Sequence, residues 1–429
     1  MGSRAVRSVV PAVLREEPAF RLLFTGQLLS VLGDRVTMLV LPFAVLSVGG
    51  GPAGVVLVSV AQFVPFVVLA LPAGVLADRL DRRRIMVASD AVRFVVQLVA
   101  GALLLTGHAG VPVLVVLAVV FGAADAFFQP AITGLVPATV SPAGLQPANA
   151  LRGLTFSIGS IAGPAIGGVL IALVGPGGSF LFDALTFAVS AVTLLLLRLP
   201  RAAQDAPAAE RQHFFADLAA GAASVRSRPW VVAFLAAGSA YTVLVLPAIF
   251  VLGPVLSGER FGGATGWAVI TAAFGVGSLA GDLLLLRWRP RFALRASALA
   301  LIGASCQGLI IGSGLGTLPV AALEVLAGVC VTVYFSLWET SLQEHVPDAE
   351  LSRVASYDYL TSTGAIPLGS VAAGALSALA GPGAAILVLG AAGLLVAFAV
   401  VAVPAVRRLP RGSGAVEAAI RPEPPAPAV

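Results

Sequence analysis

The chain has 429 residues, of which 58% are hydrophobic and only 11% are charged. A soluble domain of ordinary composition carries about 25% charged residues, so this chain has too little polar surface to cover a water-soluble globule of its length. A bilayer-spanning helix needs about 20 apolar residues, and a dozen such helices with short loops account for most of the sequence. Composition therefore excludes a string of soluble domains and predicts a protein embedded in a membrane.

The charged residues exclude several enzyme classes. There are 26 basic residues against 21 acidic ones, for a net charge of +5, and every basic residue is an arginine. A chain without lysine lacks the phosphate-binding residue of P-loop ATPases. The three histidines are scattered, and the sequence holds no HExxH spacing and no Ser/His/Asp arrangement. We therefore expect no metal site, no catalytic residues and no enzymatic activity.

Twelve apolar stretches are long enough to cross a bilayer. We predict that each is an α-helix, because in lipid the backbone must pair its polar groups within the segment. The predicted fold class is an all-α membrane protein with twelve transmembrane helices. The spans are 20–47, 53–76, 86–106, 111–129, 147–173, 178–198, 229–256, 264–286, 294–313, 317–338, 354–379 and 383–405.

The arginines indicate the orientation of these spans. Twenty-two of the 26 fall in the two termini and in every second loop, whereas the opposite loops hold only Arg260. The positive-inside rule therefore places both termini in the cytoplasm and requires an even number of spans. The same distribution argues against nucleic-acid binding, because it assigns the positive charge to topology.

The spans divide into two halves that form a weak internal sequence repeat. Gly74 and Arg82, at the end of the second span, correspond to Gly281 and Arg289 at the end of the eighth. Parallel repeats of this kind build transporters from two six-helix bundles. The predicted domains are a cytoplasmic N-terminal segment (1–19), an N-terminal six-helix bundle (20–198), a cytoplasmic linker (199–228), a C-terminal six-helix bundle (229–405) and a disordered cytoplasmic tail (406–429).

The linker contains one amphipathic stretch. Phe214, Phe215, Leu218, Ala222 and Val225 share one face at helical spacing. This pattern predicts a short helix that lies on the inner membrane surface.

The loop after the second span reads GVLADRLDRRR, from Gly74 to Arg84. A glycine allows close helix approach, and Asp78 can meet the positive N-terminus of a helix in the other half. We expect Arg82 to bridge to Asp125, near the inner end of the fourth span, so that these contacts close an inner gate. The alternative is an ordinary basic loop that only sets topology.

This loop resembles the signature of the major facilitator superfamily. The matching positions are Gly74, Asp78, Arg79, Arg82 and Arg83, whereas Asp81 stands where the family usually has glycine. The resemblance implies the major facilitator fold of two six-helix bundles, and an inner-gate role for the loop.

The fifth span carries a row of small residues. Gly159, Gly163 and Gly167 recur every four residues, with Pro164 and Gly168 beside them. Such a face permits close backbone packing, and a proline bends a helix. The row resembles the fifth-helix motif of the same superfamily, which is associated with exporters more than with importers; a simple packing face is the alternative.

Three longer stretches, 20–42, 126–151 and 353–376, resemble one efflux branch of the superfamily, that of macrolide-type drug pumps and the enterobactin exporter. The likeness runs along most of the chain and implies a bacterial inner-membrane protein. The fourth span lacks the arginine that drug:proton antiporters usually carry there. This departure puts the usual proton route of that group in doubt.

Ionisable residues inside the spans need a partner, water or a function, because each costs at least about 2.5 kcal/mol at the bilayer centre. Asp34 is either a proton-coupling residue at the cavity or one half of a structural ion pair, with Arg93 as its partner. Glu324 in the tenth span is either a second coupling carboxyl group or a hydrogen-bonded structural residue. Desolvation favours the protonated form of such a group, as proton coupling requires.

Other polar residues are candidates for the cavity wall or for local structure. Asp90 precedes Arg93 by three residues, which predicts a local ion pair. Asp183 lies near a span end, where a solvated or capping role is expected. For any one cavity candidate, ordinary packing is an equal alternative. The cavity candidates are Gln27, Gln62, Arg93, Gln97, Tyr241 and Asp358.

These observations predict a secondary active exporter of amphipathic small molecules, such as antibiotics or secondary metabolites. We expect alternating access driven by proton antiport, with the proton gradient as the energy source and no cofactor. The alternative is an importer or uniporter of a metabolite, against which the fifth-span motif argues. The expected partners are a small-molecule substrate and the lipid bilayer, and we expect a monomer that binds no nucleic acid.

Overall fold

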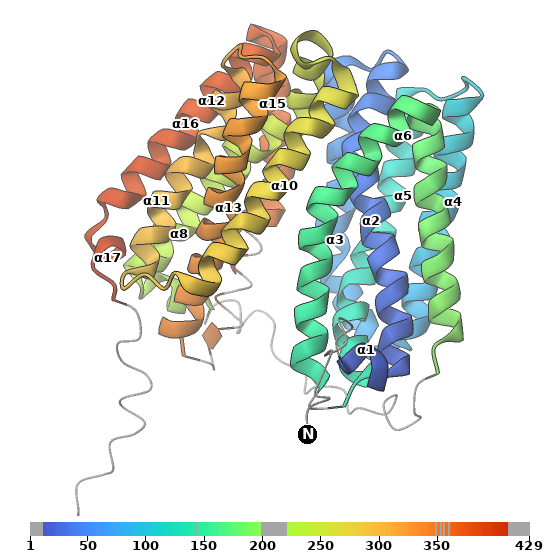
Figure 1. The fold of residues 1–429 in the computed structure, drawn as a ribbon, viewed down its shortest axis with the longest axis horizontal. Helices are drawn as coiled ribbons and strands as arrows, with labels where there is room; N and C mark the ends of the chain where they lie inside the picture. The colour runs from blue at the N-terminus through green and yellow to red at the C-terminus, as the bar shows by residue number, and fades with distance from the viewer. Residues whose placement is uncertain are drawn as a thin grey trace, which may run out of the picture.

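The computed structural model describes residues 12–141, 144–198, 221–347, 350–351, 354, 357–358 and 361–410. All regular secondary structure in this part of the chain is helical. Ten of the helical segments found there are long and apolar enough to cross a membrane. The long helices run side by side along one direction (Figure 1). The expected all-helical, multi-pass architecture is therefore confirmed.

Prolines begin three helices of the first half, and glycines follow the ends of two. Pro18, Pro52 and Pro112 each occupy the first turn of a helix, where the missing N–H costs nothing. Gly49 and Gly107 follow helix ends with φ of 79° and 73°. The elements are α1 (Ala12–Glu16), α2 (Pro18–Ser47), α3 (Gly51–Arg79), α4 (Arg82–Leu105), α5 (Val111–Leu135), η1 (Val136–Thr139) and α6 (Leu145–Leu196).

The 52-residue helix α6 is interrupted at Gly175. This residue has φ 68° and ψ −179°, a backbone conformation that glycine adopts without strain. Before it, Gly159 packs on Arg35 of α2 and Gly167 packs on Leu39, so the first limb (145–174) runs parallel to α2.

The second limb of α6 (176–196) runs the other way. Gly33 of α2 faces Asp183, and Gly26 of α2 faces Thr193, so the numbering falls on one helix as it rises on the other. The chain thus reverses direction at Gly175. The two spans expected at 147–173 and 178–198 are the two limbs of α6.

The second half repeats the pattern of long apolar helices. Residues 229–261 form one long irregular helical stretch, in which the single-turn π-helices follow or flank Pro247 and Pro254. A proline removes one intrahelical hydrogen bond, which gives the physical reason for this irregularity. The elements are α8 (Pro229–Ala240), η4 (Tyr241–Val245), η5 (Ala248–Leu252), α9 (Gly253–Leu256), η6 (Ser257–Phe261), α10 (Gly263–Arg287), α11 (Ala293–Ser305), α12 (Gln307–Gly312), α13 (Thr317–His345), η7 (Thr363–Ala365), α15 (Ile366–Ala380), α16 (Pro382–Ala402) and α17 (Pro404–Arg407).

Each half packs mainly on itself, and the two halves meet along α6 with α10 and along α3 with α15. Figure 1 shows the halves closest at the end away from α1 and further apart at the end where α1 lies. The close contacts agree with this view: a Cβ at Gly168 would overlap with that of Ala268, and a Cβ at Gly374 would lie 2.6 Å from Val56.

Part of the expected organisation falls outside the described residues. The span expected at 354–379 is represented by η7 and α15, preceded by residues that are only partly described. The amphipathic face expected in the linker includes Phe214, Phe215 and Leu218, which lie outside the described part of the chain. The same holds for the tail beyond residue 410.

Replacing Gly122 by alanine tests the packing of α5 on α3. A Cβ at Gly122 would overlap with the backbone carbonyl of Gln62, and backbone cannot rotate away as a side chain can. We expect Gly122→Ala to lower the free energy of unfolding by roughly 1–3 kcal/mol, measured by denaturation in detergent micelles. Gly153→Ala in α6 is the matched control, since nothing lies within 4 Å of its Cβ position and alanine favours a helix. Equal stability of the two variants would contradict this packing.

Candidate functional site

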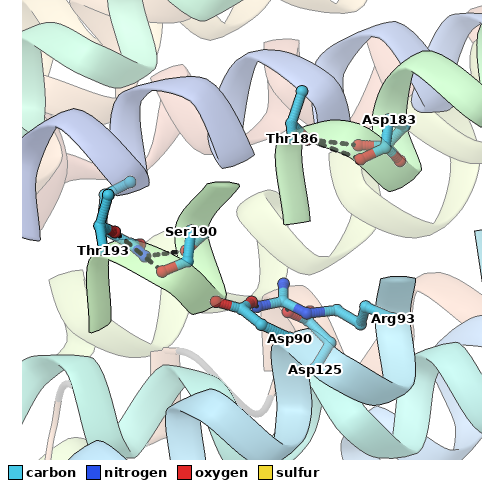
Figure 2. A network of polar contacts seen from close by, with 8 residues as sticks. Asp90, Arg93, Asp125, Asp183, Thr186, Ser190 and Thr193 are labelled. Atoms are coloured by element: carbon cyan, nitrogen blue, oxygen red, sulfur yellow. Dashed lines mark hydrogen bonds and ion pairs between the residues drawn. The ribbon is translucent and has the colours of Figure 1, made fainter. Parts of the chain in front are cut away.

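A buried cluster of charges joins α4 to α5. The Arg93 guanidinium contacts Asp90 at 2.5 Å (Nη2 to Oδ1) and Asp125 at 3.4 Å (Nη1 to Oδ1). Arg93 is 1% exposed and Asp90 0% exposed, whereas Asp125 is 29% exposed. Figure 2 shows both carboxylates turned toward the same guanidinium. The predicted local pair between Asp90 and Arg93 is present, and Asp125 extends it to a second helix.

Two aromatic rings complete the surroundings of Arg93. Its guanidinium carbon lies 4.1 Å from the ring centre of Phe128 and 4.5 Å from that of Phe187. Ring faces attract a cation, more strongly when water is excluded. The Nε atom of Arg93 and the Oδ2 atom of Asp90 are nevertheless buried without a hydrogen-bond partner. The cluster is therefore held by charge, packing and two charge-assisted hydrogen bonds, and two of its polar atoms remain without a partner.

A second buried carboxylate lies on α6. Asp183 is fully buried and accepts hydrogen bonds from Thr37 (2.7 Å), Gln97 (2.5 Å) and Thr186 (3.1 Å). All three donors are uncharged, and none of the ion pairs found among the described residues involves this carboxylate. A Cβ at Gly33 would overlap with Asp183 Oδ1, so glycine lets the carboxylate reach the α2 backbone. The expectation of a solvated or capping Asp183 is wrong, because the antiparallel packing of α6 on α2 encloses it.

Asp34 lies beside both clusters. It follows Gly33, the α2 residue that faces Asp183. It also lines a pocket together with Gln27, Ser30, Arg93, Phe128 and Arg152, with about 580 Å³ of empty volume that includes open solvent.

Two polar stripes at helical spacing produce this core. Asp90, Arg93 and Gln97 recur along α4, and Asp183, Thr186, Ser190 and Thr193 recur along α6. Figure 2 shows the α6 stripe from Asp183 to Thr193 along one face, with Ser190 toward Asp90. Polar residues three or four apart in an otherwise apolar span are the signal that marks Asp183, and it was present in the sequence.

The arginines of the loop after α3 bind helix ends. Arg82 donates to the carbonyl oxygen of Gly134 at 2.9 Å, at the end of α5. Arg83 donates to the carbonyl oxygens of Leu194 (2.6 Å) and Leu195, at the end of α6. The last carbonyls of a helix lack intrahelical partners and carry partial negative charge, so arginines stabilise both ends.

The expected bridge from Arg82 to Asp125 is not formed in this structure. Gly134 lies nine residues beyond Asp125 on α5, a distance of about 13.5 Å along a helix, and Asp125 pairs with Arg93. Asp81 accepts hydrogen bonds from the backbone N–H of Arg83 and Arg84 and thereby caps α4. The side chain of Asp78 and the surroundings of Gly74 lie outside the described part of the chain.

At the same end of the first half, Glu17 fixes the start of α2. Its Oε1 accepts a hydrogen bond from the backbone N–H of Ser141 at 3.0 Å. The hydrogen bonds from Ser141 hold the pKa of Glu17 below its usual value. This contact therefore favours the ionised carboxylate, and the stability that it adds is lost as the pH falls through that lowered pKa.

The second half holds a smaller polar core. Tyr241 donates to Gln307 at 2.8 Å, and Gln307 donates to Glu324 at 2.9 Å. Glu324 is 2% exposed, and its other oxygen, Oε1, is buried without a hydrogen-bond partner. The side chain thus has a hydrogen-bonded oxygen and an unsatisfied one, so both interpretations of Glu324 remain predictions.

The remaining cavity candidates separate into lining and packed residues. Gln62 and Gln97 line a pocket in the first half, and Gln27 and Arg93 line the pocket of Asp34. Tyr241 is 1% exposed and bonded to Gln307, so it packs in the core of the second half. Asp358 accepts a hydrogen bond from the indole of Trp338 at 3.0 Å.

Removing the buried cation tests the cluster. We expect Arg93→Gln to lower the free energy of unfolding by roughly 3–5 kcal/mol, because it leaves Asp90 and Asp125 in the interior without a cation. Arg84→Gln is the matched control: it breaks a pair of the same i, i+3 spacing with Asp81, but its side chain is 88% exposed, so we expect roughly 0–1 kcal/mol. Denaturation in detergent micelles measures both. Adding Asp90→Asn to Arg93→Gln should recover part of the loss, and no recovery would contradict the pairing.

Known proteins with similar sequences are efflux pumps. Macrolide efflux protein A of Streptococcus pyogenes is 25% identical over 362 residues, which cover 82% of this chain and 87% of the relative. The multidrug efflux pump Tap of Mycobacterium tuberculosis is 28% identical over 407 residues, covering 91% of this chain and 94% of the relative.

Solved structures with a similar fold are transporters. The nucleoside transporter NupG superposes with a TM-score of 0.68 at 12% identity, over 89% of this chain and 98% of that one. A bacterial homologue of the iron transporter ferroportin in an inward-facing state gives a TM-score of 0.67 at 16% identity, over 92% of this chain and 100% of that one. At these identities the likeness concerns the fold alone.

The family itself follows from a match along nearly the whole sequence. The model of the transmembrane secretion effector family matches residues 11–426, which include every membrane-spanning helix and both buried cores. The family and the relatives named above consist of transporters, in agreement with the loop signature at 74–84. The chain belongs to the transmembrane secretion effector family of the major facilitator superfamily.

Proposed function

We propose that this protein is a proton-coupled exporter of amphipathic small molecules in the bacterial inner membrane. The observation that carries the proposal is the position of Asp34: it lines one pocket with the buried Arg93, and it directly follows Gly33, against which Asp183 packs. A carboxyl group that is both accessible and coupled to a buried cation can change the charge balance of the core by one proton.

The charge balance favours proton binding at this place. Asp90 and Asp125 share the guanidinium of Arg93, and Asp34 lines the same pocket, so ionisation of all three carboxyl groups would leave excess negative charge around Arg93 in a low-dielectric interior. Like charges in such a site disfavour each other's ionised form, and a proton is the simplest way to relieve them. In the proposed cycle, Asp34 takes up a proton from outside, loosens its interaction with Arg93 and releases the proton inside.

The proposed topology has twelve passes in two bundles of six. It counts the two limbs of α6 separately and includes α15, which is too short in its described part to span a membrane. Both termini and the loop with Arg82 then face the cytoplasm, as the arginine distribution requires. The halves touch at the opposite end, through Gly168 with Ala268 and Val56 with Gly374, which supports an inward-open state.

The export direction rests on the relatives and on the α6 glycines. The relatives are named as efflux pumps for macrolides and for multiple drugs. The exporter-type glycines Gly159, Gly163 and Gly167 lie against α2, the helix that carries Asp34. Movement of α6 on α2 would thus change the surroundings of the coupling residue directly. Glu324 in the second half is a second candidate, because it is buried with one unsatisfied oxygen.

Export is tested in cells that lack their major drug pumps and express this chain. Accumulation of ethidium, a cation, and of carboxyfluorescein, an anion loaded as its ester, covers both charge classes. We expect lower accumulation of at least one dye, and a rise when a protonophore collapses the gradient. Equal accumulation in expressing and control cells for both dyes contradicts export, and unchanged export with the protonophore contradicts proton coupling.

The coupling residue is tested with the dye that is exported. We expect Asp34→Asn to reduce gradient-driven export at least tenfold, because the amide cannot bind and release a proton, while exchange without a gradient persists. Glu324→Gln tests the second candidate in the same assay. Glu339→Gln, at an exposed position of α13, is the control for a lost carboxyl group. Full export by both Asp34→Asn and Glu324→Gln would exclude these two residues as the coupling site.

A further inference from the structure

A third pocket lies where the two halves meet. It has about 570 Å³ of empty volume, which includes open solvent, and is lined from α2, α6, η5 and α10. Phe250, Trp267 and Phe274 supply aromatic surface, and Ser160 and Thr271 supply hydroxyl groups. Sites for small organic molecules combine apolar walls of this kind with a few polar groups. The one charged side chain among its lining residues is Arg35.

The glycines of α6 place Arg35 at this pocket. A Cβ at Gly159 would lie 3.3 Å from Cγ of Arg35, and a Cβ at Gly163 would overlap with Cβ of Arg35. Any larger residue at Gly163 would displace the arginine from α6. The glycine row therefore makes room for the guanidinium stem in addition to bringing the two helices together.

Acidic residues are scarce around this pocket. The sequence has no Asp or Glu between Asp125 and Asp183, which covers the first limb of α6, and none between Glu259 and Asp282. Asp282 lies eight residues beyond Phe274 on α10, about 12 Å along the helix. A cationic ligand would thus meet Arg35 without a carboxylate among the lining residues.

The neighbouring Asp34 belongs to a different pocket. It lines the pocket of Arg93, whereas Arg35 lines the pocket between the halves. The two adjacent residues therefore divide their roles, with the carboxyl group at the buried ion cluster and the guanidinium at the pocket between the halves.

A third arginine, Arg152, lies on the same face of α6 as Gly159. Arg152 lines the pocket of Asp34 from α6, seven residues before Gly159 and on the same helix face. Seven residues correspond to about 10 Å, so Arg152 and the position of Arg35 follow one another along the first limb of α6. In the proposed topology Arg152 lies nearer the cytoplasm.

From this arrangement we propose that the exported molecules are amphiphiles with a negatively charged group, which Arg35 binds in the pocket between the halves. Arg152 receives the anionic group on the cytoplasmic side, and the aromatic side chains hold the apolar body. An inside-negative membrane potential favours outward movement of such a charge. This substrate class rests on the proposed export function and narrows it.

The test uses the purified chain in proteoliposomes and three radiolabelled probes with one ring system. Naphthalenesulfonate carries a fixed negative charge, naphthyltrimethylammonium a fixed positive charge, and naphthalenesulfonamide none at neutral pH. We expect naphthalenesulfonate to be transported at least tenfold faster than the other two, relative to protein-free liposomes. A potassium diffusion potential should change its rate in the direction set by a negative charge.

Variants of Arg35 then assign the preference to the pocket. Arg35→Gln should lower naphthalenesulfonate transport at least tenfold and abolish the preference, whereas Arg35→Lys keeps the charge and should retain a clear preference. Arg407→Gln, exposed at the end of α17, is the matched control and should leave all rates unchanged. Thermal unfolding and gel filtration of each variant verify that a lost rate does not reflect a lost fold.

The outcomes separate the substrate class from export itself. Faster transport of the cation or the neutral probe, with Arg35→Gln unchanged, overturns the anionic class and leaves export standing. Transport of none of the probes by a folded chain also overturns it, and the two-dye assay in cells then decides whether the chain exports at all. An anion preference that survives Arg35→Gln overturns the role of Arg35.

Discussion

The guanidinium of Arg93 in the middle of an apolar bundle is the constraint on which the first half of this protein depends. A charge at this depth is costly unless it is paired, and here Asp90, Asp125, Phe128 and Phe187 surround it. The pairing draws α4, α5 and α6 together at one level. Because one polar atom of Arg93 and one of Asp90 have no hydrogen-bond partner, the cluster is not a fully satisfied network.

Small residues determine how close the helices and the charges come. In lipid there is little hydrophobic driving force for helices to associate, so close packing and polar contacts must hold them together. Gly33 lets the Asp183 carboxylate reach α2, and Gly163 lets Arg35 lie against α6. The glycines therefore shape the polar site as well as the packing. A change at these positions is expected to alter function and stability together.

The contacts between the halves differ from those within each half. Within the first half, long-range ion pairs and hydrogen bonds link α2, α4, α5 and α6. Between the halves, the close approaches are between small residues such as Gly168 and Ala268. Apolar surfaces of small residues can separate without leaving a buried polar group unpaired, as alternating access requires. Arg82 and Arg83 hold the ends of α5 and α6, so that each half can move as a unit.

The sequence by itself determined that the chain is membrane-embedded, where most of the spans run and which loop carries the superfamily signature. Apolar length, arginine bias and motif spacing are local properties of the sequence, so they can be recognised without knowing how the helices pack. It also predicted the Asp90–Arg93 pair, since both residues lie on one helix. It could not decide which side of an all-apolar helix faces the interior, because such a helix has no polar face to orient it.

Tertiary structure alone decided the partners across helices. Asp183 meets Thr37 across 146 residues of sequence, and Arg82 binds Gly134 in place of the expected Asp125. Both outcomes depend on the direction and depth at which α6 and α5 pack on their neighbours. No local sequence pattern encodes either of these quantities. The same packing separates Asp34 from Arg35, so that two adjacent residues serve two different pockets.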